Sequence, residues 1–140
     1  MTRPVVQLRW SNVNGHRLLA PLAAAGLVLA AGLAVFGLPP LDLHGPLHRV
    51  GVMDPACGLT RGVRAVARGD LGLAWSYNPG SPALVVAALG LVVRDVVGRI
   101  TGRWLNVHAA SWPVVAAVAG VAVIALWINQ QAHAGLLMGP

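Results

Sequence analysis

The chain has 140 residues, of which 56% are apolar and only 10% are charged, whereas soluble domains carry about a quarter charged residues. Ten arginines and four aspartates, with no lysine or glutamate, give a formal net charge of +6. This composition excludes an ordinary soluble globule and predicts a single integral membrane domain. It also argues against nucleic acid as a partner, because the arginines flank apolar runs and do not line a groove with stacking aromatic rings.

The first predicted transmembrane helix covers residues 18–38, which are uncharged over twenty-one positions. About twenty apolar residues are needed to cross a bilayer. The run is longer than the apolar core of a signal peptide, about 7–15 residues, and no small-x-small cleavage site closes it. The pattern therefore favours a retained helix, which Pro39 and Pro40 end.

Residues 39–80 form a basic, glycine-punctuated insert between apolar runs. On a helical wheel that starts at Leu59, three arginines fall within a narrow arc and apolar side chains lie opposite. These arginines are Arg61, Arg64 and Arg68. Gly69 suits the end of this helix, and Asp70 is a suitable N-cap for a second short helix. We expect an amphipathic interfacial helix-turn-helix whose arginines face lipid head groups.

The second predicted transmembrane helix covers residues 82–100 and starts with Ser81 as N-cap and Pro82 at the first helical position. Arg94 and Asp95 interrupt its apolar run. The favoured interpretation is an interfacial helix end, with Arg94 snorkelling to the head groups and Asp95 pairing with Arg99 one turn later. A buried proton or ion relay is the alternative.

The third predicted transmembrane helix covers residues 112–128, and a polar tail follows over 129–140. Ser111 and Pro113 repeat the start signal, and Trp112 and Trp127 bracket the run, as aromatic rings do at the two membrane interfaces. The expected fold is therefore an all-α integral membrane protein with three transmembrane helices and the interfacial helix-turn-helix between the first two.

Arginine counts predict the orientation. With the N-terminus in the cytoplasm, six arginines lie on the cytoplasmic side and four on the other, which satisfies the positive-inside rule.

Small residues recur every four positions in two of the predicted helices, a spacing that lets helix backbones approach closely. They are Gly26, Ala30 and Ala34 in the first helix, and Ala116 and Gly120 in the third. These faces either pack the three helices together or dock a partner, which would be another membrane protein or a second copy of the chain.

The segments CGLTR and GDLGLAWSYNP resemble the signature of domain of unknown function 2752, a family of small bacterial integral membrane proteins. The matching residues are Pro55, Cys57, Gly58, Thr60, Arg61, Gly69, Asp70, Ala74, Asn78 and Pro79. The resemblance implies a multi-span helical protein of the bacterial cytoplasmic (inner) membrane. It implies no activity, so no catalytic residue can be assigned from it.

The chain departs from that signature at one position, because Asp54 replaces the first cysteine of a CPxC pair. A redox dithiol within the chain is therefore ruled out. A mixed metal site made of His44, His48, Asp54 and Cys57 remains an alternative, although Gly45 and Pro46 break the helix that would align the two histidines. A nucleophilic Cys57 with a histidine base is another, and a half-buried turn residue is the simplest interpretation.

Arg61 and Asp70 are expected to hold the loop together, by capping and by bonds to neighbouring carbonyl groups. The alternative is a recessed site for an anion, such as a lipid phosphate. Since the chain lacks HExxH, GxSxG and phosphate-loop motifs, no enzyme class and no cofactor is predicted. The leading hypothesis is a non-catalytic accessory or scaffold subunit of a larger membrane complex. A thiol- or metal-dependent protein and an anionic-lipid-binding module are the alternatives.

Overall fold

The computed structural model describes residues 5–38 and 51–137, and 67% of these residues are helical. The helices are α1 (Leu19–Phe36), α3 (Leu59–Ala67), α4 (Leu71–Tyr77), α5 (Gly80–Thr101), α6 (Trp112–Ala132) and α7 (Ala134–Leu137). The strands are β1 (Val6–Ser11) and β2 (Trp104–Ala109).

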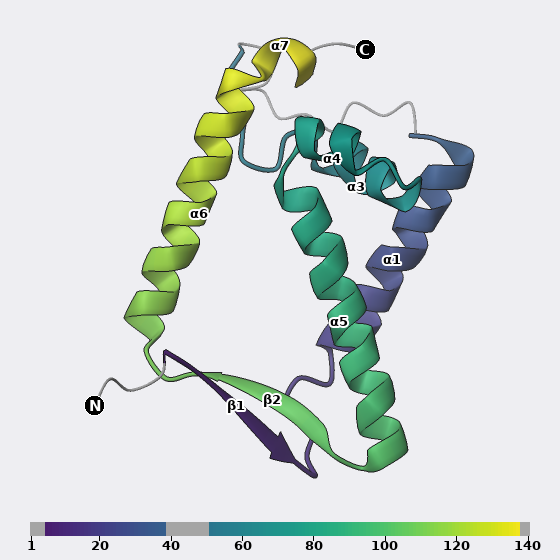
Figure 1. Ribbon diagram of the computed structural model, residues 1–140, viewed down its shortest axis with the longest axis vertical. Coiled ribbons are helices and arrows are strands. Elements are labelled where there is room, and N and C mark those ends of the chain that lie inside the picture. The colour runs from purple at the N-terminus through teal and green to yellow at the C-terminus, as the bar shows by residue number, and fades with distance from the viewer. Residues whose placement is uncertain (1–4, 39–50, 138–140) are drawn as a thin grey trace.

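Helix α5 is the centre of the arrangement (Figure 1). It runs antiparallel to α1 and packs along it. The short helices α3 and α4 cover the end of the molecule where α1 stops and α5 starts, and the two strands lie at the opposite end. Helix α6 leaves the strands, runs back to the first end and stands apart from α1 and α5.

Two of the described helices, α1 and α6, are long and apolar enough to cross a membrane, with mean hydropathies of 2.2 and 2.0. Helix α5 is not among them, although the sequence predicts a span over 82–100. Its uncharged part covers only the fourteen residues 80–93. At 1.5 Å per residue this is about 21 Å, shorter than the ~30 Å hydrocarbon core. Two candidate spans are therefore established, and the third remains a prediction.

The small sheet corrects the all-α prediction. β1 and β2 pair antiparallel, with Trp10 opposite Leu105 and Leu8 opposite Val107. Their sequences, VQLRWS and WLNVHA, mostly alternate apolar and polar residues, the period that a strand with one apolar face requires. Each strand is only six residues long, too short to stand out beside apolar runs of helical length.

The boundaries of two helices also differ from expectation. Helix α5 begins at Gly80 with Pro79 at the N-cap position, so Ser81 lies inside the helix, and its hydroxyl donates to the Leu59 carbonyl over 3.4 Å. Helix α6 begins at Trp112 after Ser111, as predicted, but continues past residue 128 to Ala132. The region assigned to a polar tail then forms α7, in which Leu137 is buried.

The helices pack through small residues. In α1, Ala30 is buried and Ala34 half-buried, whereas Gly26 is exposed. Gly98 of α5 lies directly under the Trp104 side chain, since a Cβ built on it would stand only 2.1 Å from the indole nitrogen. Close approach at such positions supplies the van der Waals contact that holds helices together when lipid provides no hydrophobic drive.

The Gly98 contact predicts a stability difference between two glycines of one helix. Gly98→Ala should destabilise the protein by about 1–3 kcal/mol, because the methyl group would displace Trp104. Gly90→Ala is the matched control, since a Cβ there meets nothing within 4 Å and should leave stability unchanged or slightly higher. Thermal unfolding of both variants in one mild detergent measures the difference, and equal midpoints would contradict it.

Candidate functional site

Part of the signature segment is joined by Asn78, at the turn between α4 and α5. Asn78 is 1% exposed and all its side-chain bonds are made within the chain. Its amide nitrogen donates to the carbonyls of Pro55 and Cys57, both over 3.0 Å, and its amide oxygen accepts from the Gly80 N–H over 2.8 Å. One side chain thus ties the turn before α3 to the start of α5.

Two glycines permit this close packing. Gly58 adopts a φ of +74°, a left-handed conformation that favours glycine, and a Cβ there would lie 2.6 Å from the Tyr77 carbonyl oxygen and from Leu137. Gly62 of α3 faces Ser81 of α5, whose hydroxyl would stand 2.0 Å from an added Cβ. Any side chain at either position would separate α3 from the structure beneath it.

The turn between α3 and α4 follows the expected capping pattern. Gly69 comes just after the end of α3 with a φ of +82°, and the Asp70 carboxylate accepts from the Leu73 N–H over 2.9 Å as the N-cap of α4. Ala74 is fully buried in α4. Thr60 is exposed, and nothing in the structure explains its presence in the signature.

The three arginines of α3 have different surroundings. Arg64 donates from Nε to the Leu33 carbonyl over 2.9 Å, near the end of α1. Arg61 donates to the Leu137 carbonyl over 3.4 Å, and its guanidinium lies 6.0 Å from the centre of the Tyr77 ring. Both side chains are half-buried, whereas Arg68 is exposed. Two of the three candidate head-group ligands therefore already bind carbonyl groups of the chain.

Cys57 lies in a small apolar cluster with Met53 and Leu137, and Tyr77 and Ala134 pack against it. Its thiol donates to the Met53 sulfur over 3.5 Å. Burial raises the pKa of the thiol and the Asp54 carboxylate raises it further, and these effects outweigh the opposing influence of Arg61 and of a backbone hydrogen bond from Gly58. The raised pKa disfavours the thiolate that a nucleophilic Cys57 would require.

The proposed mixed metal site is only partly visible. His44 and His48 lie outside the described residues, and Asp54 uses one carboxylate oxygen to accept from the Ala56 N–H over 2.8 Å. Over residues 5–38 and 51–137, no group of three histidine, cysteine or acidic side chains comes together.

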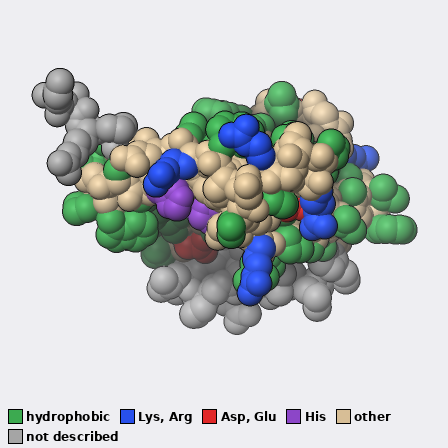
Figure 2. Space-filling model, turned by 90° about the horizontal axis from the view of Figure 1, so that it is seen from below, with side chains coloured by type: hydrophobic (Ala, Val, Ile, Leu, Met, Phe, Trp, Pro, Cys, Tyr) green, Lys and Arg blue, Asp and Glu red, His purple; other side chains and the backbone are tan. Residues whose placement is uncertain are grey.

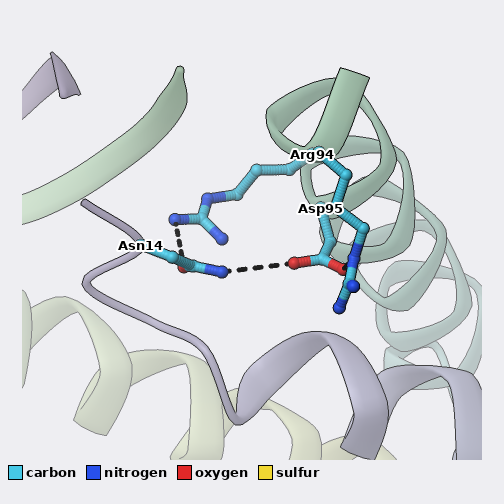
Figure 3. A network of polar contacts seen from close by, with 4 residues as sticks. Asn14, Arg94 and Asp95 are labelled. Atoms are coloured by element: carbon cyan, nitrogen blue, oxygen red, sulfur yellow. Dashed lines mark hydrogen bonds and ion pairs between the residues drawn. The ribbon is translucent and has the colours of Figure 1, made fainter. Parts of the chain in front are cut away.

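A second polar cluster surrounds the other end of α5 (Figure 3). The Asn14 side chain bridges two charged neighbours, accepting from Arg94 over 3.1 Å and donating to Asp95 over 3.2 Å. Arg94 also donates to the Asn106 side chain over 2.8 Å and to the Leu105 carbonyl. The predicted pair of Asp95 with Arg99 is present, at 2.7 Å. The predicted snorkelling of Arg94 is wrong, because its guanidinium turns inward to the strands.

Asn106 of β2 holds this cluster to the N-terminal segment. It is 5% exposed, and its amide nitrogen donates to the Ser11 hydroxyl over 2.7 Å and to the Val13 carbonyl over 2.9 Å. Its amide oxygen accepts from the Gly15 N–H over 3.1 Å in addition to Arg94. Arg94 and Asp95 of α5 are thereby bonded to residues far away in sequence, whereas Arg99 is exposed.

Buried polar atoms without a hydrogen-bond partner occur at both ends of the molecule. At the strand end they are Nη1 of Arg94 and Nε1 of Trp104. At the other end, Gln130 of α6 is fully buried, and within residues 5–38 and 51–137 neither atom of its amide has a partner. Its neighbour Gln131 is well bonded, to the Gly51 carbonyl and the Met53 N–H, both over 3.0 Å.

Asn14 and Asn106 are structural residues that were not predicted from the sequence. The available signal was the alternating pattern around residues 6–11 and 104–109, which places Asn106 on the polar face of a strand. Once those strands pair, the polar face of β2 brings Asn106 to the charged end of α5. Gln130 carried no such signal, since it lies among other polar residues after an apolar run.

The Asn78 bonds predict a large loss of stability when they are removed. Asn78→Ala leaves two carbonyls and one N–H without partners, and each buried unsatisfied group costs about 1–3 kcal/mol. Ser76→Ala is the control, because that exposed hydroxyl bonds only the Gly72 carbonyl of its own helix. We expect the thermal midpoint to fall sharply for the first variant and hardly at all for the second. A small change for Asn78→Ala would contradict the assigned role.

The environment of Cys57 predicts slow reaction with a maleimide. The thiolate is the reacting species, so a raised pKa lowers the reactive fraction at neutral pH, and labelling should accelerate as the pH rises. Asp54→Asn keeps an oxygen for the Ala56 N–H but removes the charge that raises the pKa. This variant should therefore label severalfold faster than the parent at the same pH. Full labelling of the parent should require unfolding in dodecyl sulfate. Fast labelling of the folded parent at neutral pH would contradict this prediction.

Comparison with known proteins bears on one part of the chain. The family model for a protein of unknown function (DUF2752) matches residues 46–92, which include α3, α4 and α5 as far as Val92. No curated protein and no solved structure gives a match. The match includes the segment from Pro55 to Pro79 whose bonds are described above, and it confirms the resemblance found in the sequence. Over residues 46–92, the chain is thus similar to the DUF2752 proteins of unknown function.

Proposed function

We propose that this protein is a non-catalytic accessory subunit of the bacterial inner membrane, which crosses the bilayer three times and docks a larger membrane protein through α6. The observation that carries the proposal is the isolation of α6. No residue of its most apolar 18-residue window is buried within the structure. Helices α1 and α5 pack on each other, whereas α6 offers a complete apolar surface to its surroundings.

The direction of the chain supports the third crossing. Helices α1 and α6 both run from the strand end towards the opposite end, and α5 runs back between them (Figure 1). If α1 and α6 both cross the membrane, α5 has to return the chain across it. Its charged last turns are compatible with this, because Asn14 and Asn106 bond Arg94, and Asn14 and Arg99 bond Asp95. Bonding to neighbouring polar groups is how ionisable residues are tolerated at membrane depth.

The arginine distribution supports a cytoplasmic N-terminus. Among the described residues, five arginines belong to the strand end and three to the α3 end. The first group is Arg9, Arg17, Arg94, Arg99 and Arg103, and the second is Arg61, Arg64 and Arg68. By the positive-inside rule, this excess favours a cytoplasmic strand end.

The small residues of α6 define the docking face. Ala116 and Gly120 lie one turn apart and are exposed, and a Cβ built on Gly120 meets nothing within 4 Å. A partner helix could therefore approach the α6 backbone closely along this line, as in other small-xxx-small contacts. In α1 the corresponding residues Ala30 and Ala34 are at least half-buried, which leaves less room for a partner.

The two alternative functions receive less support. A thiol-dependent reaction needs an accessible thiolate, whereas Cys57 is buried and its pKa is raised. A lipid site on α3 needs unoccupied guanidinium groups, whereas Arg61 and Arg64 donate to carbonyls of the chain.

The docking face predicts a specific effect of bulk. Gly120→Leu should abolish recovery of a stoichiometric partner when the tagged protein is purified in a mild detergent, because the side chain blocks close approach. Ala122→Leu adds the same kind of bulk at an exposed position about 200° around the helix and should leave recovery unchanged. Recovery of a lone monomer from several mild detergents, or of a homo-oligomer only, would contradict the proposal. Equal effects of the two variants would contradict the assigned face.

A further inference from the structure

A shallow apolar crevice lies at the strand end, between the last turns of α5 and strand β1. It is lined by Trp10, Val97, Thr101 and Arg103 and has a volume of about 270 Å³. The lining is almost wholly apolar, so water gains few hydrogen bonds there. The crevice is also many times larger than the ~30 Å³ that one water occupies in the liquid. An apolar group of the surroundings is the natural occupant of such a space.

The same end of the molecule has more N–H donors than acceptors. The Nη1 group of Arg94 and the indole N–H of Trp104 are buried and find no acceptor in the part of the chain that the structure describes. The guanidinium of Arg103, at the crevice, takes part in no hydrogen bond or ion pair of the described residues. All three belong to the last two turns of α5 or to the residues just after it. Of these three groups, Arg103 alone lines the crevice, so its guanidinium is the donor that a ligand in the crevice would meet.

The charge around the crevice is positive. Figure 2 shows this end of the molecule from below, where arginine and histidine side chains gather over the strands and the neighbouring helix ends. Arg9, Arg17, Arg99 and Arg103 are exposed. Asp95 is the one acidic side chain of the strand end among the described residues, and it is buried and bonded to Arg99 and Asn14. The surface therefore attracts anions and offers them no competing carboxylate.

We propose that the crevice binds one anionic phospholipid. The upper part of an acyl chain lies against Trp10 and Val97, and the phosphate accepts from the Arg103 guanidinium at the edge. A free phosphate ion does not fit these observations, because the lining of the crevice is apolar and would exclude a strongly hydrated ion. The head groups of a surrounding bilayer stand at the ends of its spanning helices, so such a lipid is available at the end of α5.

The test uses the full chain in nanodiscs with equal amounts of phosphatidylglycerol and phosphatidylcholine, and counts the lipids retained per chain by native mass spectrometry after mild detergent washing. The parent should retain one phosphatidylglycerol. Arg103→Gln should lower that retention about tenfold, as expected from the loss of a charge-assisted hydrogen bond. Arg17→Gln is the matched control, because it removes the same charge from the same end outside the crevice, and its effect should stay below about twofold.

A second pair of variants tests the acyl chain without changing the charge. Val97→Phe should fill the crevice and lower retention to a similar extent, whereas Val86→Phe, at an exposed position nearer the start of the same helix, should not. Thermal unfolding of all four variants checks that they fold. Equal losses of lipid in Arg103→Gln and Arg17→Gln would show that retention depends only on the net charge of this end, and would overturn the proposal. Unchanged retention in Val97→Phe, equal retention of phosphatidylcholine, or displacement of the lipid by glycerol phosphate would overturn it as well.

Discussion

The structure depends on one requirement, that the polar groups at both ends of α5 find partners within the chain. At each end a buried asparagine from outside the helix makes several of these bonds, Asn78 from the turn just before α5 and Asn106 from β2. At the start of α5, Asn78 bonds two carbonyls and one N–H. At the charged end, Asn106 bonds Arg94 and three groups of the N-terminal segment. An amide suits both places, because it donates and accepts at once and adds no charge to an apolar environment.

The need to join the start of α5 to its neighbours explains why the residues that match the family signature lie close together in the sequence. Gly58 permits a close approach, Asp70 caps a helix and Asn78 joins two turns. Each of these contacts is made within the segment of residues 46–92 or against α7. The signature therefore describes a folded cap on the α1–α5 pair, whose cysteine packs against Met53 and Leu137. The departure at Asp54 fits the same account, since its carboxylate bonds the Ala56 N–H and helps to raise the pKa of the Cys57 thiol.

The two ends of the molecule differ in what they leave available. At the α3 end, the carbonyls of Leu33 and Leu137 accept from Arg64 and Arg61, so those charges are used internally. At the strand end, the Arg103 guanidinium and the indole N–H of Trp104 have no acceptor among the described residues. Between the ends, α6 exposes its apolar surface on all sides. The surfaces left available to other molecules are therefore α6 and the strand end. The cap formed by α3 and α4 holds α1 and α5 together.

The sequence by itself determined the features that depend on local composition. Length and hydropathy identified α1 and α6, and local backbone chemistry identified the stop at Gly69 and the cap at Asp70. It also predicted the pairing of Asp95 with Arg99, because residues four apart on a helix are neighbours. Only the tertiary structure decided the inward turn of Arg94, the burial of Cys57 and the roles of Asn78 and Asn106. These outcomes depend on contacts between segments far apart in the chain, and the free energy of a polar or ionisable group depends on which neighbours replace water around it.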